Sequence, residues 1–317
     1  MKEKPNCSTE FWLLHNSYPQ GANVFKVGIA IVFLICTAQV TSFRIFGGRV
    51  AKSGEYPMMV SLREKTNGGH ICGGILIAPR AVLTAAHCVR RCLKEAPSIC
   101  AQQYSVMLGD INRNVKDSSP TTRQIIRLRT IILHKNFTTA TLQNDIAYIE
   151  LIHDAKFSRN VDIAALAPQR PDVGQQCVVT GWGATEEGKS SMVLLVTLVH
   201  IINDEVCIKR LKKFRPNHMI CAGDLSGCND SCQGDSGGPL ICGAKEIAGI
   251  VSFGIGCALE EYASAYTDVR AYMGWITERL ARSQTSIKLQ PKLYLVVWLR
   301  MVLMHFILSV LNWVYKL

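Results

Sequence analysis

Short apolar segments, separated by glycine, asparagine and proline residues, dominate the central part of this 317-residue chain. Five of these segments are Met58–Leu62, Ile75–Ile77, Ile125–Leu128, Cys177–Thr180 and Ile247–Val251. Segments of this length with frequent turn residues between them are typical of β-strands in barrels. The pattern therefore predicts an all-β architecture. From Val269 to Leu280 the apolar residues recur every three or four positions instead, which predicts a helix with one apolar face.

An apolar run of 14 residues, Val27–Val40, lies before this β-rich part. It is short for a membrane-spanning helix and suits the apolar core of a secretory signal peptide. We expect residues 1–38 to be a signal peptide that is cleaved after Ala38. The 26 residues before the run are long for such a leader, so two alternatives stay open: a start assigned too far upstream, or an uncleaved signal anchor.

A longer apolar run, Leu293–Tyr315, lies within the tail formed by residues 283–317. Its 23 residues are enough to cross a bilayer, but Arg300, His305 and Asn312 oppose insertion. Three interpretations stay open. The tail is membrane-associating, or it is a removed or disordered extension, or it is a lipid-anchor signal, with Ser283 or Ser286 as the attachment site.

The charge and the cysteine content narrow the classes of function. The net charge is +11, of which residues 1–44 contribute +2 and residues 283–317 contribute +4. The remaining part is only mildly basic and has no basic block interleaved with aromatic residues, which argues against a nucleic-acid partner. Thirteen cysteines indicate an oxidising compartment, so we expect the protein to be secreted.

Three short motifs supply the residue types of nucleophilic catalysis. Ser236 stands in Gly-Asp-Ser-Gly-Gly-Pro, His87 in Thr-Ala-Ala-His-Cys, and Asp145 in Asn-Asp-Ile-Ala. A serine hydroxyl is a weak nucleophile unless an adjacent base takes its proton, and a carboxylate can orient that base. The three motifs are far apart in the chain, so they carry this meaning only if the fold brings them together.

With three further motifs, the chain resembles the chymotrypsin-like (S1, trypsin-type) serine peptidases. These motifs are Cys72-Gly73-Gly74, Gly181-Trp182-Gly183 and Asp230-Ser231-Cys232-Gln233, and the resemblance runs from about residue 45 to residue 282. It implies two six-stranded antiparallel β-barrels around a cleft, with a C-terminal α-helix packed on the second barrel. Residues 45–282 would form this peptidase domain, preceded by a short activation peptide, residues 39–44.

The resemblance also implies roles for the motif residues. Ser236 would be the nucleophile, His87 the general base, and Asp145 the carboxylate that orients His87. The backbone N–H groups of Gly234 and Ser236 would form the oxyanion hole. Asp230, six residues before the serine, would lie at the base of the primary pocket and favour Arg or Lys side chains.

Two residues of the implied substrate-binding region depart from the family pattern. The segment Ser252-Phe253-Gly254 resembles the strand that pairs with substrate, but Phe253 stands where tryptophan is usual. Ser264 stands where members that cleave after Arg or Lys have glycine. Its hydroxymethyl group would narrow the pocket and could hydrogen bond to Asp230. We therefore expect a weakened or altered preference for Arg and Lys.

Activation is implied at the junction between Arg44 and Ile45. Cleavage there would free the α-amino group of Ile45, which in this family pairs with the acid before the nucleophile, here Asp235. Such a buried pair would act as a switch that forms the pocket and the oxyanion hole. Phe46 replaces the usual small β-branched residue, which puts the efficiency of activation in question.

Disulfide pairing is also implied by the resemblance. The expected pairs are Cys72–Cys88, Cys177–Cys242, Cys207–Cys221 and Cys232–Cys257. Outside the family pattern, Cys92 and Cys100 could close a local loop, and Cys7 and Cys36 lie in the leader. Cys228 then has no evident partner, and we expect a buried free thiol there, with an intermolecular bridge as the alternative.

A calcium site and a glycan are the remaining expectations. Asp110, Asn112, Val115 and Asp117 resemble part of the family's calcium loop, but Pro120 stands where a carboxylate is expected. Because calcium takes six or more oxygen ligands, we expect no cofactor and no tightly bound metal. Asn136-Phe137-Thr138 is a glycosylation sequon on a predicted surface loop, whereas the one at Asn229 should be inaccessible.

The sequence as a whole favours a secreted serine endopeptidase made as a zymogen, with protein substrates, an activating protease and protein inhibitors as its partners. Two alternatives stay open. One is a catalytically silent homologue that acts as a binding module, suggested by Phe46, Phe253 and Ser264. The other is a membrane-tethered peptidase held by residues 283–317.

Overall fold

The computed structural model describes residues 48–66, 68–114, 122–185 and 187–283. The expected leader, the activation junction at Arg44 and Ile45, Phe46 and the apolar tail lie outside these residues. In the described part of the chain, no helix is long and apolar enough to span a membrane.

Six antiparallel strands close into a first barrel, in the order β2-β3-β4-β7-β6-β5. Their bounds are β2 Met59–Glu64, β3 His70–Ala78, β4 Ala81–Thr84, β5 Tyr104–Leu108, β6 Gln124–Leu133 and β7 Ala147–Leu151. Strand β6 shows how the sequence fits the barrel. Ile126 and Leu128 are buried, and a register shift against β7 after Leu128 makes Ile131 the next buried residue.

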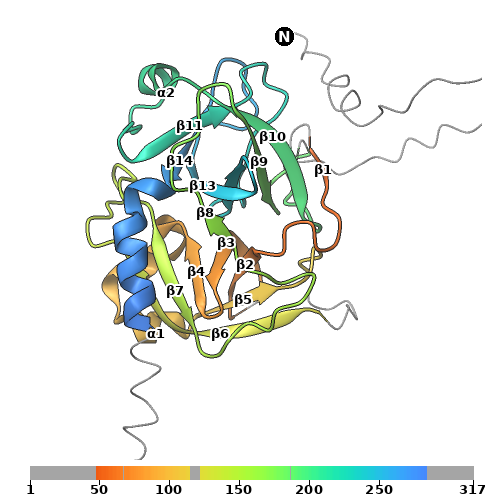
Figure 1. Cartoon of the computed structure of the whole chain (residues 1–317), viewed down its shortest axis with the longest axis vertical. Coiled ribbons are helices and arrows are strands. Elements are labelled where there is room, and N and C mark those ends of the chain that lie inside the picture. Colours follow the sequence, from red (N-terminus) through yellow and green to blue (C-terminus); the bar gives the residue numbers. More distant parts are fainter. Residues whose placement is uncertain (1–47, 67, 115–121, 186, 284–317) are drawn as a thin grey trace, which may run out of the picture.

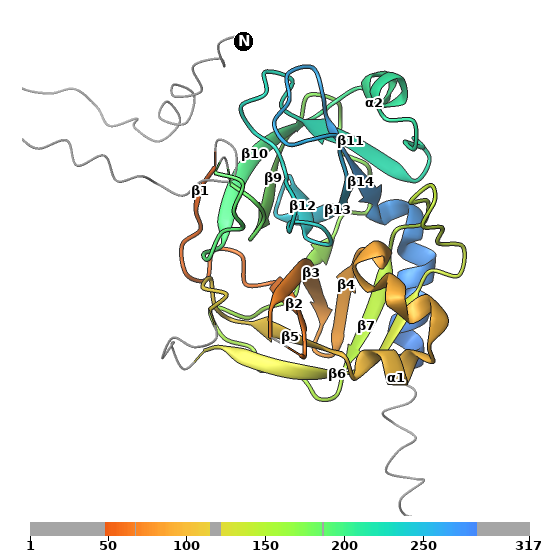
Figure 2. The same cartoon turned by 180° about the vertical axis from the view of Figure 1, so that it is seen from behind.

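Six more strands form a second barrel, in which β9, β10, β11, β14, β13 and β12 pair in turn and β12 returns to β9. Their bounds are β9 Gln176–Gly181, β10 Leu195–Ile201, β11 Met219–Gly223, β12 Pro239–Cys242, β13 Glu246–Phe253 and β14 Ser264–Asp268. Figures 1 and 2 show the two barrels one above the other. The predicted fold class, two six-stranded antiparallel barrels with a C-terminal helix, is confirmed.

The remaining elements are short. They are β1 (Arg49–Val50), β8 (Ala165–Leu166), α1 (Pro97–Ala101), α2 (Asp204–Arg210) and the 3-10 helices Ala86–Lys94 and Val269–Tyr272. Strand β1 pairs with β10 on the second barrel, and β8 runs parallel to β13. Residues 273–283 are α-helical and continue the 3-10 helix that ends at Tyr272.

The C-terminal helix packs on a cluster that contains residues of both barrels, not on the second barrel alone as we expected. Its buried apolar residues are Val269, Tyr272 and Ile276. The same cluster contains Ile75, Leu83 and Tyr148 from the first barrel and Ile247 and Ile250 from the second. The helix therefore holds the two barrels together by burying apolar surface between them (Figure 1).

Five disulfides join pairs of described cysteines. Four are the pairs that the family resemblance implied, Cys72–Cys88, Cys177–Cys242, Cys207–Cys221 and Cys232–Cys257, and the fifth is Cys92–Cys100. Cys228 is also disulfide-bonded, so the expectation of a free thiol there was wrong. The free thiol was inferred because the family pattern gives Cys228 no partner. A disulfide outside that pattern cannot be recognised from the sequence.

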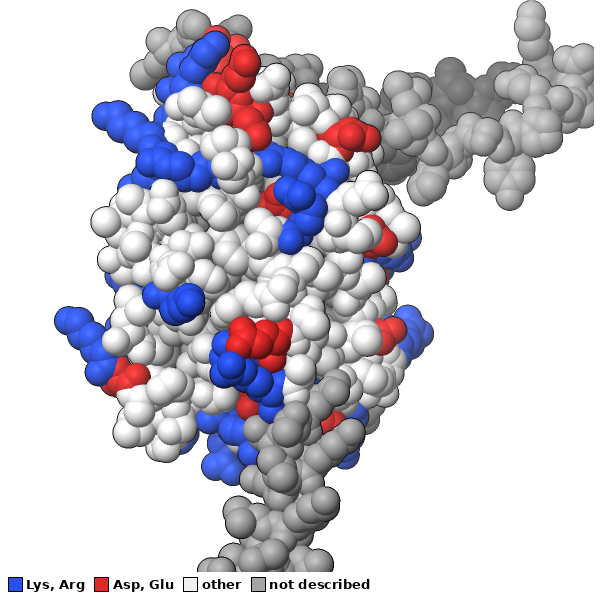
Figure 3. Space-filling model, turned by 60° about the vertical axis from the view of Figure 1, so that its left-hand side comes forward, with Lys and Arg blue, Asp and Glu red and all other residues white. Residues whose placement is uncertain are grey.

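Charged side chains of both signs are interspersed on the face shown in Figure 3. Lysines and arginines form several separate groups, acidic residues lie beside many of them, and wide uncharged areas separate the groups. The described residues also form exposed ion pairs, such as Arg282 with Glu278 and Arg210 with Glu261. Exposed pairs of this kind add little to stability, so the fold rests on its apolar clusters and disulfides.

Replacing Ile250 with alanine should therefore weaken the contact between the barrels. Ile250 is fully buried in the shared cluster, so we expect a loss of about 2–5 kcal/mol in the free energy of unfolding. Urea unfolding, followed by tryptophan fluorescence in a Ser236→Ala background, measures it. The matched control is Ile208→Ala on α2, where the side chain is 52% exposed and the expected change is within about 0.5 kcal/mol. Equal losses from both variants would contradict this description of the core.

Candidate active site

His87 and Asp145 come together because they stand at the ends of neighbouring strands. His87 lies just after β4 and Asp145 just before β7, and Thr84 of β4 pairs with Ala147 of β7. The Asp145 carboxylate accepts hydrogen bonds from His87 Nδ1, at 2.7 Å, and from the His87 backbone N–H, at 2.8 Å. The His87 ring is thus held in one orientation, with the proton on Nδ1.

The second barrel completes the surroundings of Asp145, whose side chain is fully buried. Ser252 Oγ donates a hydrogen bond to Asp145 Oδ2 at 2.6 Å, and Thr267 Oγ1 donates to the Asp145 carbonyl at 2.9 Å. Ser252 lies at a register shift between β13 and β14, and such an irregularity can re-aim a side chain. The carboxylate is therefore bound by both barrels. The contribution of Thr267 was missed because no local pattern marks it.

Ser236 is held by its backbone in a turn between the barrels. Its carbonyl accepts a hydrogen bond from Gly73 N of β3 at 2.8 Å, and Gly237 N donates to Val251 O of β13 at 2.9 Å. Ser236 and His87 line the same cavity, of about 360 Å³. Among the described residues no hydrogen bond joins Ser236 to His87, and catalytic contacts of this kind often tighten only when substrate binds.

In the described part of the chain, the turn before Ser236 leaves two backbone N–H groups without an acceptor. Neither Gly234 N nor Ser236 N donates to any atom of the described residues. Gly234 has a φ of +104°, a conformation that other residues rarely adopt. The two groups that the sequence analysis assigned to an oxyanion hole are thus available to a substrate atom.

A histidine that the sequence analysis missed supports this turn. His70 Nε2 donates to Gly234 O at 3.0 Å, and its Nδ1 accepts from Ser61 Oγ at 2.8 Å. Burial lowers the pKa of His70 to about 4, so the ring is neutral near pH 7 and can make both contacts. His70 stands on β3 beside Cys72, but nothing in the sequence marks its contact with a residue 164 positions later.

Asp235 is fully buried behind the same turn. Its carboxylate accepts hydrogen bonds from Gly183 N and Cys232 N, both at 2.8 Å. A side chain at Gly181 or Gly183 would overlap this carboxylate, which explains the glycines of the Gly-Trp-Gly motif. No cation of the described residues pairs with Asp235, and burial raises its pKa to about 7.

Ser236, Phe253, Gly254 and Ser264 are among the residues that line another cavity, of about 240 Å³. Asp230 is buried behind this lining, next to Ser231 and Ser264. Its carboxylate accepts hydrogen bonds from Ser231 N at 2.8 Å, Ser264 Oγ at 3.0 Å and Ala258 N at 3.1 Å. The hydrogen bond that we anticipated from Ser264 is therefore present. Burial raises the pKa of Asp230 to about 6, despite these donors.

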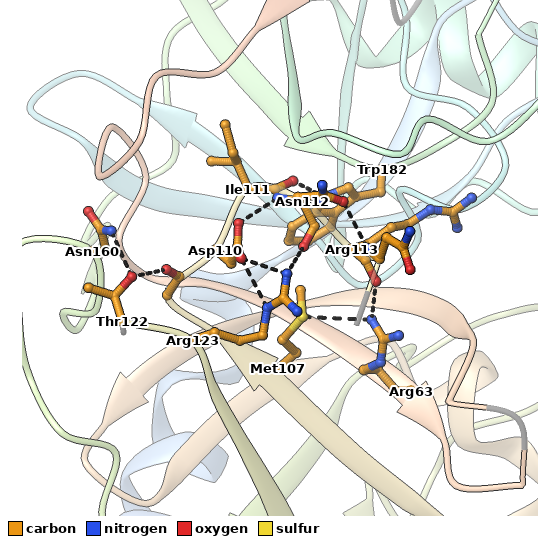
Figure 4. A network of polar contacts seen from close by, with 12 residues as sticks. Arg63, Met107, Asp110, Ile111, Asn112, Arg113, Thr122, Arg123, Asn160 and Trp182 are labelled. Atoms are coloured by element: carbon orange, nitrogen blue, oxygen red, sulfur yellow. Dashed lines mark hydrogen bonds and ion pairs between the residues drawn. The ribbon is translucent and has the colours of Figure 1, made fainter. Parts of the chain in front are cut away.

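The region of the expected calcium loop is organised around an ion pair instead (Figure 4). The Asp110 carboxylate accepts from Asn112 N at 2.8 Å and pairs with Arg123 at 2.7 Å. Arg63 and Arg113 lie close by, so the surroundings are cationic. Val115, Asp117 and Pro120 lie outside the described residues.

One cluster has the spacing of metal ligands, but its chemistry does not fit. Cys72, His87 and Cys88 offer ligand atoms within 4.8 Å of one another. Both cysteines belong to one disulfide, so their sulfurs are not thiolates and cannot bind a metal in the usual way. The cluster is the disulfide that braces the turn carrying His87.

Comparison with known proteins agrees with this arrangement. The Trypsin family model matches residues 45–276. The chain is 37% identical over 241 residues to trypsin II-P29 of Gallus gallus, a match that covers 75% of this chain and 90% of that protein. It is likewise 37% identical over 241 residues to a trypsin of Squalus acanthias, covering 75% and 96% of the two chains.

Two closed β-barrels around a buried aspartate, a histidine hydrogen-bonded to it and a serine turn define a chymotrypsin-like serine peptidase. The chain belongs to the trypsin family of serine endopeptidases.

The uncleaved protein should lose stability as pH rises from about 4 to 7. In this range Asp235 ionises in the unfolded state but stays protonated in the fold, where its pKa is about 7, so the unfolded state binds fewer protons. Asp230, whose pKa in the fold is about 6, also lowers the stability as pH rises to about 6. Urea unfolding of Ser236→Ala protein across this range measures the slope. Asp235→Asn should remove most of the decline, and an unchanged slope in that variant would contradict the assignment.

Proposed function

We propose that this chain is a secreted zymogen which, once cleaved after Arg44, hydrolyses peptide bonds that follow Arg or Lys. The observation that carries the proposal is the buried Asp145 carboxylate fixed to His87 beside a cavity that also contains Ser236. In this mechanism His87 takes the proton of Ser236 Oγ as that oxygen attacks the substrate carbonyl. His87 then protonates the leaving amine, and Asp145 stabilises the imidazolium that forms in between.

Charge that develops on the substrate oxygen is stabilised by the N–H groups of Gly234 and Ser236. Neither group has an acceptor among the described residues, so both can donate to the tetrahedral intermediate without first breaking another bond. Loss of one such donor typically costs about 3–4 kcal/mol of activation free energy.

The proposed specificity for basic residues depends on Asp230, whose carboxylate is hydrogen-bonded to Ser264 in the lining of the 240 Å³ cavity. An unpaired buried carboxylate is costly, and a substrate cation would lower that cost. Phe253 provides an apolar wall, and Ser252 and Gly254 lie on the strand that would pair with the substrate backbone. All three proposed catalytic residues are present, so we do not favour the alternative of a silent binding module.

Activation follows from the state of Asp235. Its carboxylate is buried and has no cation partner among the described residues. The α-amino group of Ile45, freed by cleavage after Arg44, would supply that partner and fix the turn that carries Ser236.

Secretion is consistent with five described disulfides and with the family of the chain. Asn136 is exposed, which supports its use as a glycosylation site. We propose no metal cofactor, because Asp110 is already paired with Arg123. Membrane tethering by residues 283–317 stays the alternative, and fractionation of proteins with and without this tail tests it.

A cleavage profile of the activated protein on a peptide library tests the proposal. We expect cuts after Arg and Lys, and loss of at least about 10³-fold in kcat/KM for these peptides when Asp230 is replaced by serine. Cuts after Phe or Leu in preference to Arg and Lys would contradict the role of Asp230. No cleavage by protein shown to start at Ile45 would favour the binding module.

Ser264→Gly should raise kcat/KM for Arg and Lys substrates by about tenfold. The change widens the cavity and frees Asp230 Oδ1 from the Ser264 hydroxyl, so that this oxygen can accept from the substrate cation. Steady-state kinetics with a pair of Arg and Lys peptides measures the change. Ser53→Gly, at an exposed site outside these cavities, is the control and should change nothing. A fall in kcat/KM for Ser264→Gly would contradict the account.

A further inference from the structure

The cavity that contains Ser236 and His87 extends beyond these two residues to Arg90 and Arg91. The 240 Å³ cavity above Asp230 and the 360 Å³ cavity beside His87 share Ser236 as a lining residue. Consider a substrate whose scissile bond lies at Ser236 and whose basic side chain fills the 240 Å³ cavity. The rest of its chain must continue past Ser236, away from that cavity. On the proposed function, the 360 Å³ cavity therefore receives the residues that follow the cleaved bond.

Part of the lining of the 360 Å³ cavity is apolar. It includes Ile71 and the Cys72–Cys88 disulfide, which lies directly beside His87. These groups admit side chains by shape and supply no charge of their own. Discrimination by charge must come from Glu64, Arg90 and Arg91, which line the same cavity.

Those side chains leave an excess of positive charge. Arg91 pairs with Glu64 at 3.0 Å, so the acid that lines this cavity is already neutralised. Arg90 is exposed and has no carboxylate partner within ion-pair distance among the residues that the structure describes. Among the side chains that line this cavity, the uncompensated charge is therefore that of Arg90.

Another cavity, of about 460 Å³, adjoins the 360 Å³ cavity. It shares Arg90 and Arg91 with that cavity and adds Lys94 and Glu95. The Glu95 carboxylate accepts a hydrogen bond from Gln103 Nε2 at 2.7 Å, whereas Lys94 makes no ion pair in the described part of the chain. Lys94 thus adds a second cation without an acidic partner, among the described residues, in a cavity that Arg90 also lines.

We propose that this groove selects substrates with Asp or Glu among the first three residues after the cleaved bond, and that Arg90 is the main determinant. The enzyme would then read two charges: a basic residue before the bond, at Asp230, and an acidic residue after it, at Arg90. Because Arg90 is exposed, the preference is modest, at about fivefold, which corresponds to about 1 kcal/mol. It also weakens at high salt, because solvent ions screen an exposed pair.

Quenched-fluorescent peptides that differ only at these three positions test the inference. Each position carries Asp, Gln or Lys in turn, with Arg before the cleaved bond, and kcat/KM is measured at low and high salt. We expect at least one position where Asp is preferred to Gln by about fivefold and to Lys by more. Arg90→Gln should abolish this preference and Arg90→Glu should invert it toward Lys. Equal rates for the three residues at every position would overturn the inference.

Two controls separate this inference from the function on which it rests. Arg159→Glu makes the same change of charge at an exposed position that lines none of these three cavities, and should keep the wild-type ratio of Asp to Lys peptides. A peptidyl nitroanilide has no amino acid after the scissile bond. If the wild type cleaves this nitroanilide but shows no preference for Asp in the peptides, only the role of Arg90 is overturned. Failure to cleave it after activation overturns the proposed function, and this inference with it.

Discussion

The site depends on one buried carboxylate that both barrels hold in place. Asp145 receives two hydrogen bonds from His87 of the first barrel and one from Ser252 of the second. A buried carboxylate is costly unless its oxygens are hydrogen-bonded. The hydrogen bonds from His87 that satisfy the Asp145 carboxylate also fix the orientation of the His87 ring. The shared apolar cluster and the C-terminal helix keep the two barrels in the relative position that this contact needs.

Two further buried carboxylates have no cation beside them in the part of the chain that the structure describes. Asp230 and Asp235 accept hydrogen bonds from neutral groups only, and burial raises the pKa of each well above its usual range. Each therefore favours a nearby cation, which the substrate would supply to Asp230 and the new N-terminus to Asp235. The same physical property, a carboxylate buried without a counter-charge, would thus serve both specificity and activation.

Much of this arrangement could be predicted from the sequence because short, distinctive motifs mark it. The apolar segments predicted the strands, and the residues around Ser236, His87 and Asp145 predicted a site between two barrels. Contacts between distant residues left no such mark: His70 with Gly234, and Thr267 with Asp145, depend on how the strands pair. The sequence analysis predicted that the helix packs on one barrel, because an apolar face does not show which surfaces it covers. The disulfide at Cys228 was missed because it follows no family pattern.

Covalent labelling of Ser236 tests the central claim most directly. Protein cleaved after Arg44 is treated with a serine-directed phosphonate that carries a basic side chain, and the rate and position of labelling are followed by mass spectrometry. The account predicts stoichiometric modification of Ser236, slowed by about 10⁴-fold in Asp145→Asn because His87 loses its orienting carboxylate. Labelling of Asp145→Asn at the wild-type rate, or no labelling of the wild type, would contradict it.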